Sequence, residues 1–200
     1  MQENKLIESK DIIQNHVIYS MGAGMIPVPL ADMVAVSGVQ INMIRQLAKL
    51  YSIPFEETQT KALISALSGS IISKVGARTL VKFIPGIGSL LGGVAMGVVS
   101  GASTYALGEA FNFHFQTGGS ILDFDTNKMK KFYDEQFEKG KKVAEDLKKQ
   151  SDAQKSDQAS NPTENNDIVV KLRELSDLKN AGIISETDFI EMKKKLIEKY

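Results

Sequence analysis

The sequence has 200 residues with 24 basic and 24 acidic side chains, so its balanced charge gives no general attraction to nucleic acid. It contains no cysteine, which excludes disulfide bonds and thiolate chemistry. Apolar residues recur at three- and four-residue spacing with few alternating runs, so we predict an all-α fold. The mixed charges of residues 3–11 are not typical of a signal peptide.

Charge is distributed unevenly along the chain. Residues 17–115 carry 10 charged side chains, whereas residues 116–200 carry 33. This difference predicts that the apolar front half (17–115) and the charged back half (116–200) lie in two different environments. We expect the front half to associate with the cytoplasmic membrane, integrally or peripherally, and the charged C-terminal half to lie in the cytoplasm. A wholly cytoplasmic protein is the alternative.

The front half is predicted to form four helices. The first ends at the sequence GAGMIPVP (22–29), because proline lacks an amide proton and glycine loosens the backbone. The turn IPGIG (84–88) separates the third helix from the fourth. The predicted helices cover residues 4–21, 30–51, 57–83 and 89–115.

The back half is predicted to begin with a fifth helix, which Asp125 or Thr126 caps and which reaches about Lys149. Residues 150–166 contain no apolar residue larger than alanine and cannot bury enough surface to offset the entropy of ordering, so we predict a flexible linker. The predicted domains are a helical domain at 1–149, the linker at 150–166 and a small helical hairpin at 167–200.

Within the C-terminal hairpin, Gly182 suits a left-handed helix end. Ser185 and Asp188 form a short-acid variant of the capping box before the second helix. The hairpin is therefore expected to be a structural unit of its own.

The uncharged segment 83–108 contains seven glycines, and a phosphate-binding loop is one interpretation. The Walker pattern fails because the pair Gly140–Lys141 lacks the upstream glycine. The dinucleotide pattern fails because Leu91 stands where its third glycine belongs. We therefore expect no nucleotide site in this segment and no cofactor in the chain.

Close helix packing is the second interpretation of this segment. Small residues spaced four apart form one helix-packing face that would let another backbone approach closely: Ser89, Gly93, Gly97 and Gly101. We expect its partner to be the preceding helix, in a glycine-rich hairpin that turns at 84–88.

A bilayer span is the third interpretation, because Ser89–Gly108 gives 20 uncharged residues, of which 11 are apolar. A buried hairpin in a soluble bundle remains the alternative.

Other polar residues have a structural interpretation beside a chemical one. Asp32 is either a functional acid in a low-charge region or a complement to its helix dipole, which we favour. The stretch 123–134 matches part of a calcium loop, but Lys128 replaces the turn glycine, so we favour a helix cap. His16 and His114 lack neighbouring ligands, so we expect no metal site and no catalytic residue.

The region 26–118 resembles the helical family known as domain of unknown function 697. The likeness is carried by IPVPLAD (26–32), QINMIRQLAKLY (40–51), KFIPGIG (82–88) and TYALG (104–108). The family-motif residues within these stretches are Pro27, Pro29, Asp32, Pro85, Gly86, Gly88, Thr104 and Gly108. The resemblance implies a membrane domain that accompanies a small GTPase. The sequence contains no GTPase segment, so the GTPase would be a separate partner.

The stretch 171–197 is similar to the short C-terminal domain called SHOCT. The residues that match its pattern include Leu175, Leu178, Gly182, Phe189 and Leu196. That resemblance implies a role in protein–protein interaction and no enzymatic activity.

Together these features predict a non-enzymatic, membrane-associated helical module that acts as a scaffold or partner of a GTPase, with the hairpin as an interaction arm. The helix at 128–149 carries eight lysines and five acids, which either face anionic lipid or remain in solvent. A soluble helical adaptor that binds a GTPase or another protein is the alternative, and an oligomeric pore-like or toxin-like protein ranks lowest. The expected partners are the membrane, a GTPase and further copies of the chain, and not nucleic acid.

Overall fold

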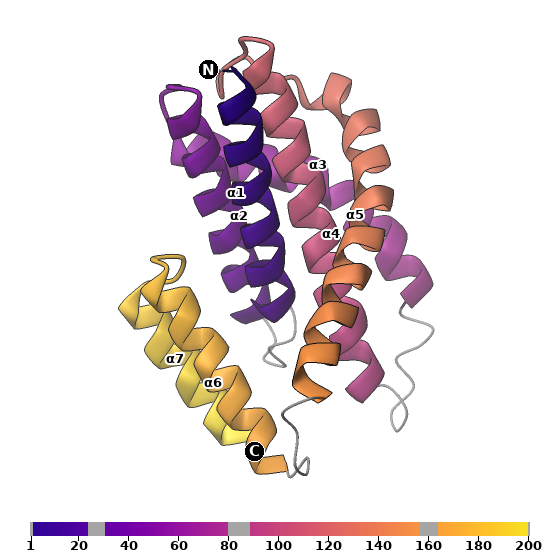
Figure 1. The fold of residues 1–200 in the computed structure, drawn as a ribbon, viewed down its shortest axis with the longest axis vertical. Coiled ribbons are helices and arrows are strands. Elements are labelled where there is room, and N and C mark those ends of the chain that lie inside the picture. Colours follow the sequence, from indigo (N-terminus) through magenta and orange to yellow (C-terminus); the bar gives the residue numbers. More distant parts are fainter. Residues whose placement is uncertain (1, 24–30, 80–88, 157–163, 200) are drawn as a thin grey trace.

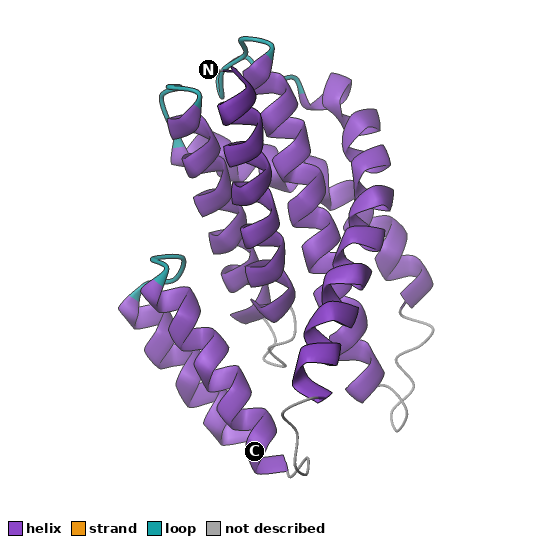
Figure 2. Ribbon diagram, in the orientation of Figure 1, coloured by secondary structure: helices purple, strands orange, loops and turns teal. Residues whose placement is uncertain are grey.

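The structure, a computed structural model, describes residues 2–23, 31–79, 89–156 and 164–199. Within these ranges the chain forms helices joined by turns (Figure 2), and the all-α prediction is confirmed. The seven helices of the described ranges are α1 (Gln2–Ala23), α2 (Ala31–Leu50), α3 (Glu57–Thr79), α4 (Ser89–Gln116), α5 (Thr126–Ser156), α6 (Glu164–Asn180) and α7 (Glu186–Lys199).

Helices α1 to α5 form one bundle, in which α4 contacts each of the other four. The chain runs up and down, so the α2–α3 and α4–α5 connections lie at the same end of the bundle as the N-terminus (Figure 1). Helices α6 and α7 form a hairpin that packs beside α1 and α2. The protein therefore consists of a five-helix bundle with a docked C-terminal hairpin.

Helix α5 is longer than the sequence indicates. Its predicted end lies near Lys149, whereas the helix continues to Ser156, and α6 already begins at Glu164. Both ends of the predicted linker are thus helical. Residues 150–156 include alanine, glutamine and lysine, which favour helix even without an apolar face. Residues 157–163, the predicted turn 84–88 and most of the predicted break at 22–29 lie outside the described residues.

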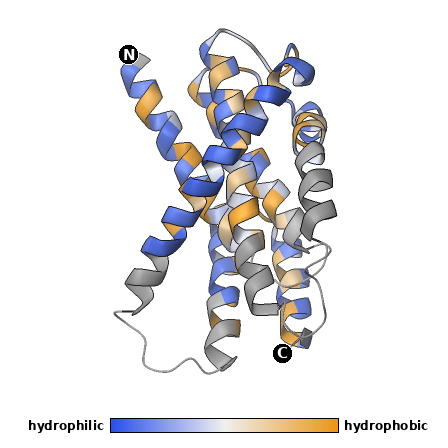
Figure 3. Ribbon diagram, turned by 90° about the vertical axis from the view of Figure 1, so that its right-hand side faces the viewer, coloured by the Kyte–Doolittle hydropathy of each residue, from blue (hydrophilic) through white to orange (hydrophobic). Residues whose placement is uncertain are grey.

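The main core lies between helices α1 to α5. Phe111 of α4 stacks on Phe124 with 4.4 Å between ring centroids, and Tyr133 of α5 is fully buried. The outer face of α5 carries lysines, and Figure 3 looks at this side and shows hydrophilic residues along the nearest helix. Other buried side chains of this core are Ile13, Val17, Met43, Ile44, Leu47, Leu63, Leu67 and Leu107.

Close packing by small residues joins α4 to α1 and α5. A Cβ atom built on Gly101 would stand 2.6 Å from Met21 Cγ of α1 and 3.2 Å from Ala144 Cβ of α5. The predicted pairing of this face with the preceding helix is therefore wrong at Gly101, because α1 and α5 flank α4 there. Across the described ranges, α4 packs mainly against these two helices, and α3 contributes less.

Helix α4 contains the stretch Ser89–Gly108, which the sequence raises as a bilayer span. Glycine, serine and threonine make up the nine residues of this stretch that are not apolar, which lowers its hydropathy. Among the helices of the described ranges, none combines the length with the apolar character that a membrane crossing requires.

Candidate functional site

The candidate site is the contact between α2 and the turn of the C-terminal hairpin, which we call the seam. Ile183 in this turn lies against Gly38 of α2, where an added Cβ would stand 2.7 Å from the Ile183 carbonyl oxygen. Glycine at position 38 therefore allows the two backbones to approach closely. The buried residues of the seam come from the bundle (Ala23, Ala35 and Val39) and from the hairpin (Leu175, Leu178, Ile183, Ile184, Met192 and Leu196).

Local chemistry fixes the shape of the hairpin turn. Gly182 has a φ of 66°, the left-handed conformation that the sequence predicts for the end of α6. The Asp188 carboxylate accepts hydrogen bonds from the Ser185 backbone N–H at 3.0 Å and from its hydroxyl at 2.6 Å. The Asp188 N–H in turn donates to the Ser185 hydroxyl at 3.1 Å, so the predicted capping box is confirmed.

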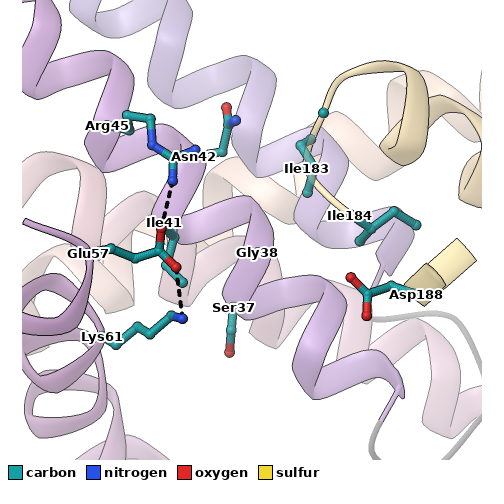
Figure 4. Close-up of a pocket in the computed structure, with 11 residues that line it drawn as sticks. Ser37, Gly38, Ile41, Asn42, Arg45, Glu57, Lys61, Ile183, Ile184 and Asp188 are labelled. Carbon is teal, nitrogen blue, oxygen red and sulfur yellow. Dashed lines mark hydrogen bonds and ion pairs between the residues drawn. The ribbon is translucent and has the colours of Figure 1, made fainter. Parts of the chain in front are cut away.

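A cleft of about 590 Å³ lies between α2, α3 and the hairpin turn. Figure 4 shows Arg45, Glu57 and Lys61 on one side of it and Asp188 on the other. Glu57 lies 3.0 Å from Arg45 Nη2 and 2.8 Å from Lys61 Nζ. The hydrogen bond and charge of Lys61, followed by the charge of Arg45, lower the pKa of the Glu57 carboxyl group. This wall is therefore held together by its own ion pairs.

A second cleft, of about 220 Å³, lies between α1, α2 and the same turn. The buried His16 faces it, with Nδ1 2.7 Å from the Ile12 carbonyl oxygen and Nε2 3.0 Å from Asn42 Oδ1. Asn42 and Ile183 line both clefts, so the clefts meet at the seam. The hairpin turn thus contacts the bundle with open space beside the contact.

Sequence reasoning missed a buried polar network that joins four helices. The Ser20 hydroxyl of α1 lies 2.6 Å from the Thr104 hydroxyl of α4, and Gln40 Nε2 of α2 donates to Thr104 at 3.2 Å and to Ser103 at 3.4 Å. The Ser103 hydroxyl lies 3.0 Å from the Tyr133 hydroxyl of α5. Burial, slightly offset by the bond to Ser103, raises the pKa of Tyr133 to about 12. The available signal was the adjacent hydroxyl residues Ser103 and Thr104 within the uncharged segment 83–108.

Two family-motif residues lie in the core of the bundle. Thr104 is fully buried in the polar network. A Cβ on Gly108 would stand 2.8 Å from Ile13 Cγ1 and 3.1 Å from Met43 Sδ, so this glycine lets α1 and α2 approach α4. Asp32 is the second residue of α2. The remaining motif residues lie outside the described residues: Pro27, Pro29, Pro85, Gly86 and Gly88.

The structure describes two of the four residues of the predicted helix-packing face in detail. Gly97 is buried, and Gly101 has the close neighbours given above. Ser89 and Gly93 lie on α4, but their surroundings fall outside what the structure describes. In the hairpin, Phe189 is partly buried, with Lys179 Nζ 4.7 Å from its ring centroid. Leu175, Leu178 and Leu196 come together in one buried cluster.

The calcium-like stretch acts as a helix cap. Asp125 Oδ1 accepts backbone N–H groups from Asn127 at 3.0 Å and Lys128 at 3.2 Å. Asp123 accepts the N–H and the hydroxyl of Ser120, each at 2.6 Å, and these bonds lower the pKa of the Asp123 carboxyl to about 2. The cap interpretation is confirmed at Asp125. In the described part of the chain, no three His, Cys, Asp or Glu side chains gather as a metal-ligand set.

Comparison with known families adds a decisive observation. The model of the family described as "Domain of unknown function (DUF697)" matches residues 2–142, which include α1 to α4 and more than half of α5. The chain belongs to the DUF697 family. The α6–α7 hairpin lies beyond the matched residues, so the seam joins the DUF697 region to a segment outside it.

One relative of this DUF697 protein is Magnetosome membrane protein 22 of Magnetospirillum gryphiswaldense. The two sequences are 36% identical over 149 residues, which cover 72% of this chain and 76% of the relative. No solved structure matches the chain.

Proposed function

We propose that this protein is a non-enzymatic, membrane-associated helical module with a C-terminal interaction arm. The observation that carries the proposal is the 36% identity, over 149 residues, to a protein named a magnetosome membrane protein. The low charge of residues 17–115 supports the same role, because few charged groups would need to be desolvated against lipid.

Support for a non-enzymatic role comes from the structural use of the polar groups. His16 contacts Ile12 and Asn42 between two helices, and Asp125 caps α5. Glu57 on the wall of the larger cleft is held in ion pairs with Arg45 and Lys61. Each of these groups has a partner that explains its position without a reaction.

The interaction arm in this proposal is the α6–α7 hairpin. Its likeness to the SHOCT pattern supports this role, as does its position outside the family-matched region. On the bundle side, the contact with the hairpin is made by the small side chains Ala23, Ala35 and Val39. Ile190 and Ile197 are 59% and 50% exposed on α7, and they lie seven residues apart on one face.

A GTPase on a separate chain is the partner that the family resemblance suggests. We propose that the bundle is a scaffold for such a GTPase at the membrane. Tagged full-length protein, recovered from detergent-solubilised cells with GDP or a non-hydrolysable GTP analogue, should retain a GTPase. Recovery of no GTPase under either condition would remove this part of the proposal.

Fractionation of cells that express the native protein tests the membrane role. The protein is expected to sediment with membranes, and successive washes with high salt and carbonate distinguish the modes of attachment. Release by salt indicates electrostatic docking, release only by carbonate indicates peripheral apolar contact, and resistance to both indicates integral insertion. Recovery in the initial supernatant would contradict the proposal in favour of a soluble adaptor.

Protease added to inside-out vesicles should cleave the charged C-terminal half if that half lies in the cytoplasm.

A further inference from the structure

Helix α7 carries apolar side chains on two opposite faces. On its inner face, Met192 and Leu196 are 4% and 0% exposed and belong to the buried cluster of the seam. On its outer face, Ile190 and Ile197 lie two turns apart and are 59% and 50% exposed. The inner face explains how the hairpin is held together, whereas the described parts of the chain leave much of the outer face open to an external partner.

Two lysines stand beside the isoleucines of the outer face. Lys193 and Lys194 follow Ile190 by three and four residues and precede Ile197 by four and three, so they flank the two isoleucines on the helix surface. The Lys194 side chain is 75% exposed, with Nζ 3.9 Å from the Glu198 carboxylate. Lys193 is also exposed, with Nζ 6.0 Å from the Phe189 ring centroid. The outer face therefore combines two aliphatic side chains with two ammonium groups.

The acidic side chains of α7 are bonded within the hairpin. Each of the four has a partner there: Glu186 with Lys179, Asp188 with Ser185, Glu191 with Lys195 and Glu198 with Lys194. Three of these partners are lysines, which offset the negative charge near the outer face. An anionic surface could therefore approach the two isoleucines without meeting an uncompensated acid of α7.

This composition suits a lipid surface better than a protein partner. Protein interfaces are depleted in lysine, and their binding energy is concentrated in tryptophan, tyrosine and arginine, which the outer face lacks. Helices that lie in the membrane interface instead insert aliphatic side chains below lysines whose ammonium groups reach the phosphates. With 14 residues, α7 is about 21 Å long, which suits a helix lying on a bilayer and is too short to cross one.

We propose that the outer face of α7 docks on an anionic lipid surface. Ile190 and Ile197 enter the boundary between headgroups and acyl chains, and Lys193 and Lys194 contact lipid phosphates. This inference rests on the proposed membrane association and names the partner of the interaction arm. The cytoplasmic leaflet supplies anionic lipid. Because the inner face stays in the seam, the hairpin would hold the bundle beside the membrane (Figure 1).

A fluorescent label on α7 of the full-length protein tests the contact directly. The chain has no cysteine, so Thr187→Cys gives one attachment point, exposed and one turn before Ile190. An environment-sensitive dye there should shift its emission to the blue with vesicles of phosphatidylcholine and about 30% phosphatidylglycerol, and much less with phosphatidylcholine alone. The same dye on Ser65→Cys, at an exposed position of α3, should keep its emission with both.

Matched pairs of substitutions, made in the protein labelled at position 187, separate the outer face from general surface properties. Ile190→Ser/Ile197→Ser should weaken the apparent vesicle affinity by about tenfold or more. Its control is Ile7→Ser/Ile18→Ser on α1, where the isoleucines are 58% and 48% exposed, and this control should leave the affinity unchanged. Circular dichroism checks that each variant retains its helices.

A second pair of variants removes charge in place of apolar surface. Lys193→Gln/Lys194→Gln should lower the affinity by about fivefold for each lysine. Lys130→Gln/Lys131→Gln removes an adjacent, exposed lysine pair from α5 and should have no effect. Raising the salt concentration should weaken docking of the unsubstituted outer face more than docking of the Lys193→Gln/Lys194→Gln variant, because salt screens exposed charges.

An unchanged emission from the label at position 187 with anionic vesicles would overturn the inference. Equal losses of affinity in the α7 variants and their matched controls would also overturn it. So would a co-purifying protein that Ile190→Ser/Ile197→Ser releases while vesicle binding persists, because the outer face would then serve a protein. Vesicle sedimentation reports the proposed function separately: a chain that sediments with vesicles while its α7 label stays in water is membrane-associated through another surface.

Discussion

Gly140 of α5 lies directly against the backbone of Ala102 in α4. A Cβ on Gly140 would stand 2.8 Å from the Ala102 carbonyl oxygen and 3.0 Å from its Cα. One turn further along α5, Ala144 faces Gly101, so small residues four apart on α5 meet two consecutive small residues on α4. Small residues thus let the backbones of α4 and α5 approach closely at this point.

Gly140→Leu should destabilise the protein by about 1–3 kcal/mol, because the new side chain meets main-chain atoms that cannot move aside independently. The measurement is urea unfolding followed by circular dichroism. Gly69→Leu is the matched control, since it makes the same substitution on an exposed helix position with open space around the new Cβ. We expect the control to hold or raise stability by up to about 1 kcal/mol through helix propensity. Equal midpoints for the two variants would contradict close packing at Gly140.

Thr104→Val removes the central hydroxyl of the buried network while keeping the shape of the side chain. The Ser20 hydroxyl and the Gln40 amide would each lose a partner in a buried environment. We expect a loss of about 1–3 kcal/mol in the free energy of unfolding. The double variant Ser20→Ala/Thr104→Val should lose less than the sum of the single changes, because it also removes one of the stranded groups. Simple additivity in this double-mutant cycle would mean that the two hydroxyls are not coupled.

The raised pKa of Tyr133 predicts that the free energy of unfolding falls at high pH. Its pKa rises from an ordinary value of 10.0 to about 12 in the folded state, so the folded protein keeps the phenolic proton when the unfolded chain has already released it. Below pH 10 this contribution is complete, and it is lost as the pH rises from 10 to 12, by about 2–3 kcal/mol in total. Unfolding measured across this range should show a smaller decline for Tyr133→Phe. The partly exposed Tyr19→Phe provides the comparison, and a decline as steep in Tyr133→Phe as in Tyr19→Phe would refute the assignment.

Gly182→Ala should loosen the C-terminal hairpin, because its φ of 66° costs an L-residue about 1–2 kcal/mol. Amide hydrogen exchange should accelerate in α6 and α7 and remain unchanged in α4. Gly182→Asn is the control, because asparagine tolerates the left-handed conformation and should restore most of the protection. Similar exchange rates in the alanine variant and the native protein would show that the turn does not depend on this backbone geometry.

The positions of the helices could be predicted because they depend on local signals. The proline and glycine residues of 22–29 mark the C-terminal end of α1 and the start of α2. Asp125 supplies the cap of α5. The capping box at Ser185 and the left-handed Gly182 were likewise readable from neighbouring residues. The end of α5 was predicted poorly, because polar residues such as those of 150–156 permit both helix and coil.

The partners of the helices could not be predicted in the same way. The stripe of glycines on α4 indicates close packing, but α1, α3 and α5 all offer small residues, and spacing along one helix does not identify its neighbour. Gly140 illustrates this limit: in the sequence it stood only as a failed phosphate-loop glycine, whereas in the fold it contacts Ala102. Gly38 gave no signal either, because its partner Ile183 lies 145 positions away.

The hydroxyl groups of α4 also determine which movements the protein permits. Hydrogen bonds from Ser100, Ser103 and Thr104 fix the positions of α1, α2 and α5 along the axis of α4. Ser20 of α1 bonds to the Ser100 carbonyl and the Thr104 hydroxyl. Ser103 bonds to Gln40 of α2 and to Tyr133 of α5. Sliding α4 by one turn would break all of these bonds at once and leave their groups buried. The bundle is therefore expected to respond to a binding partner as a rigid body.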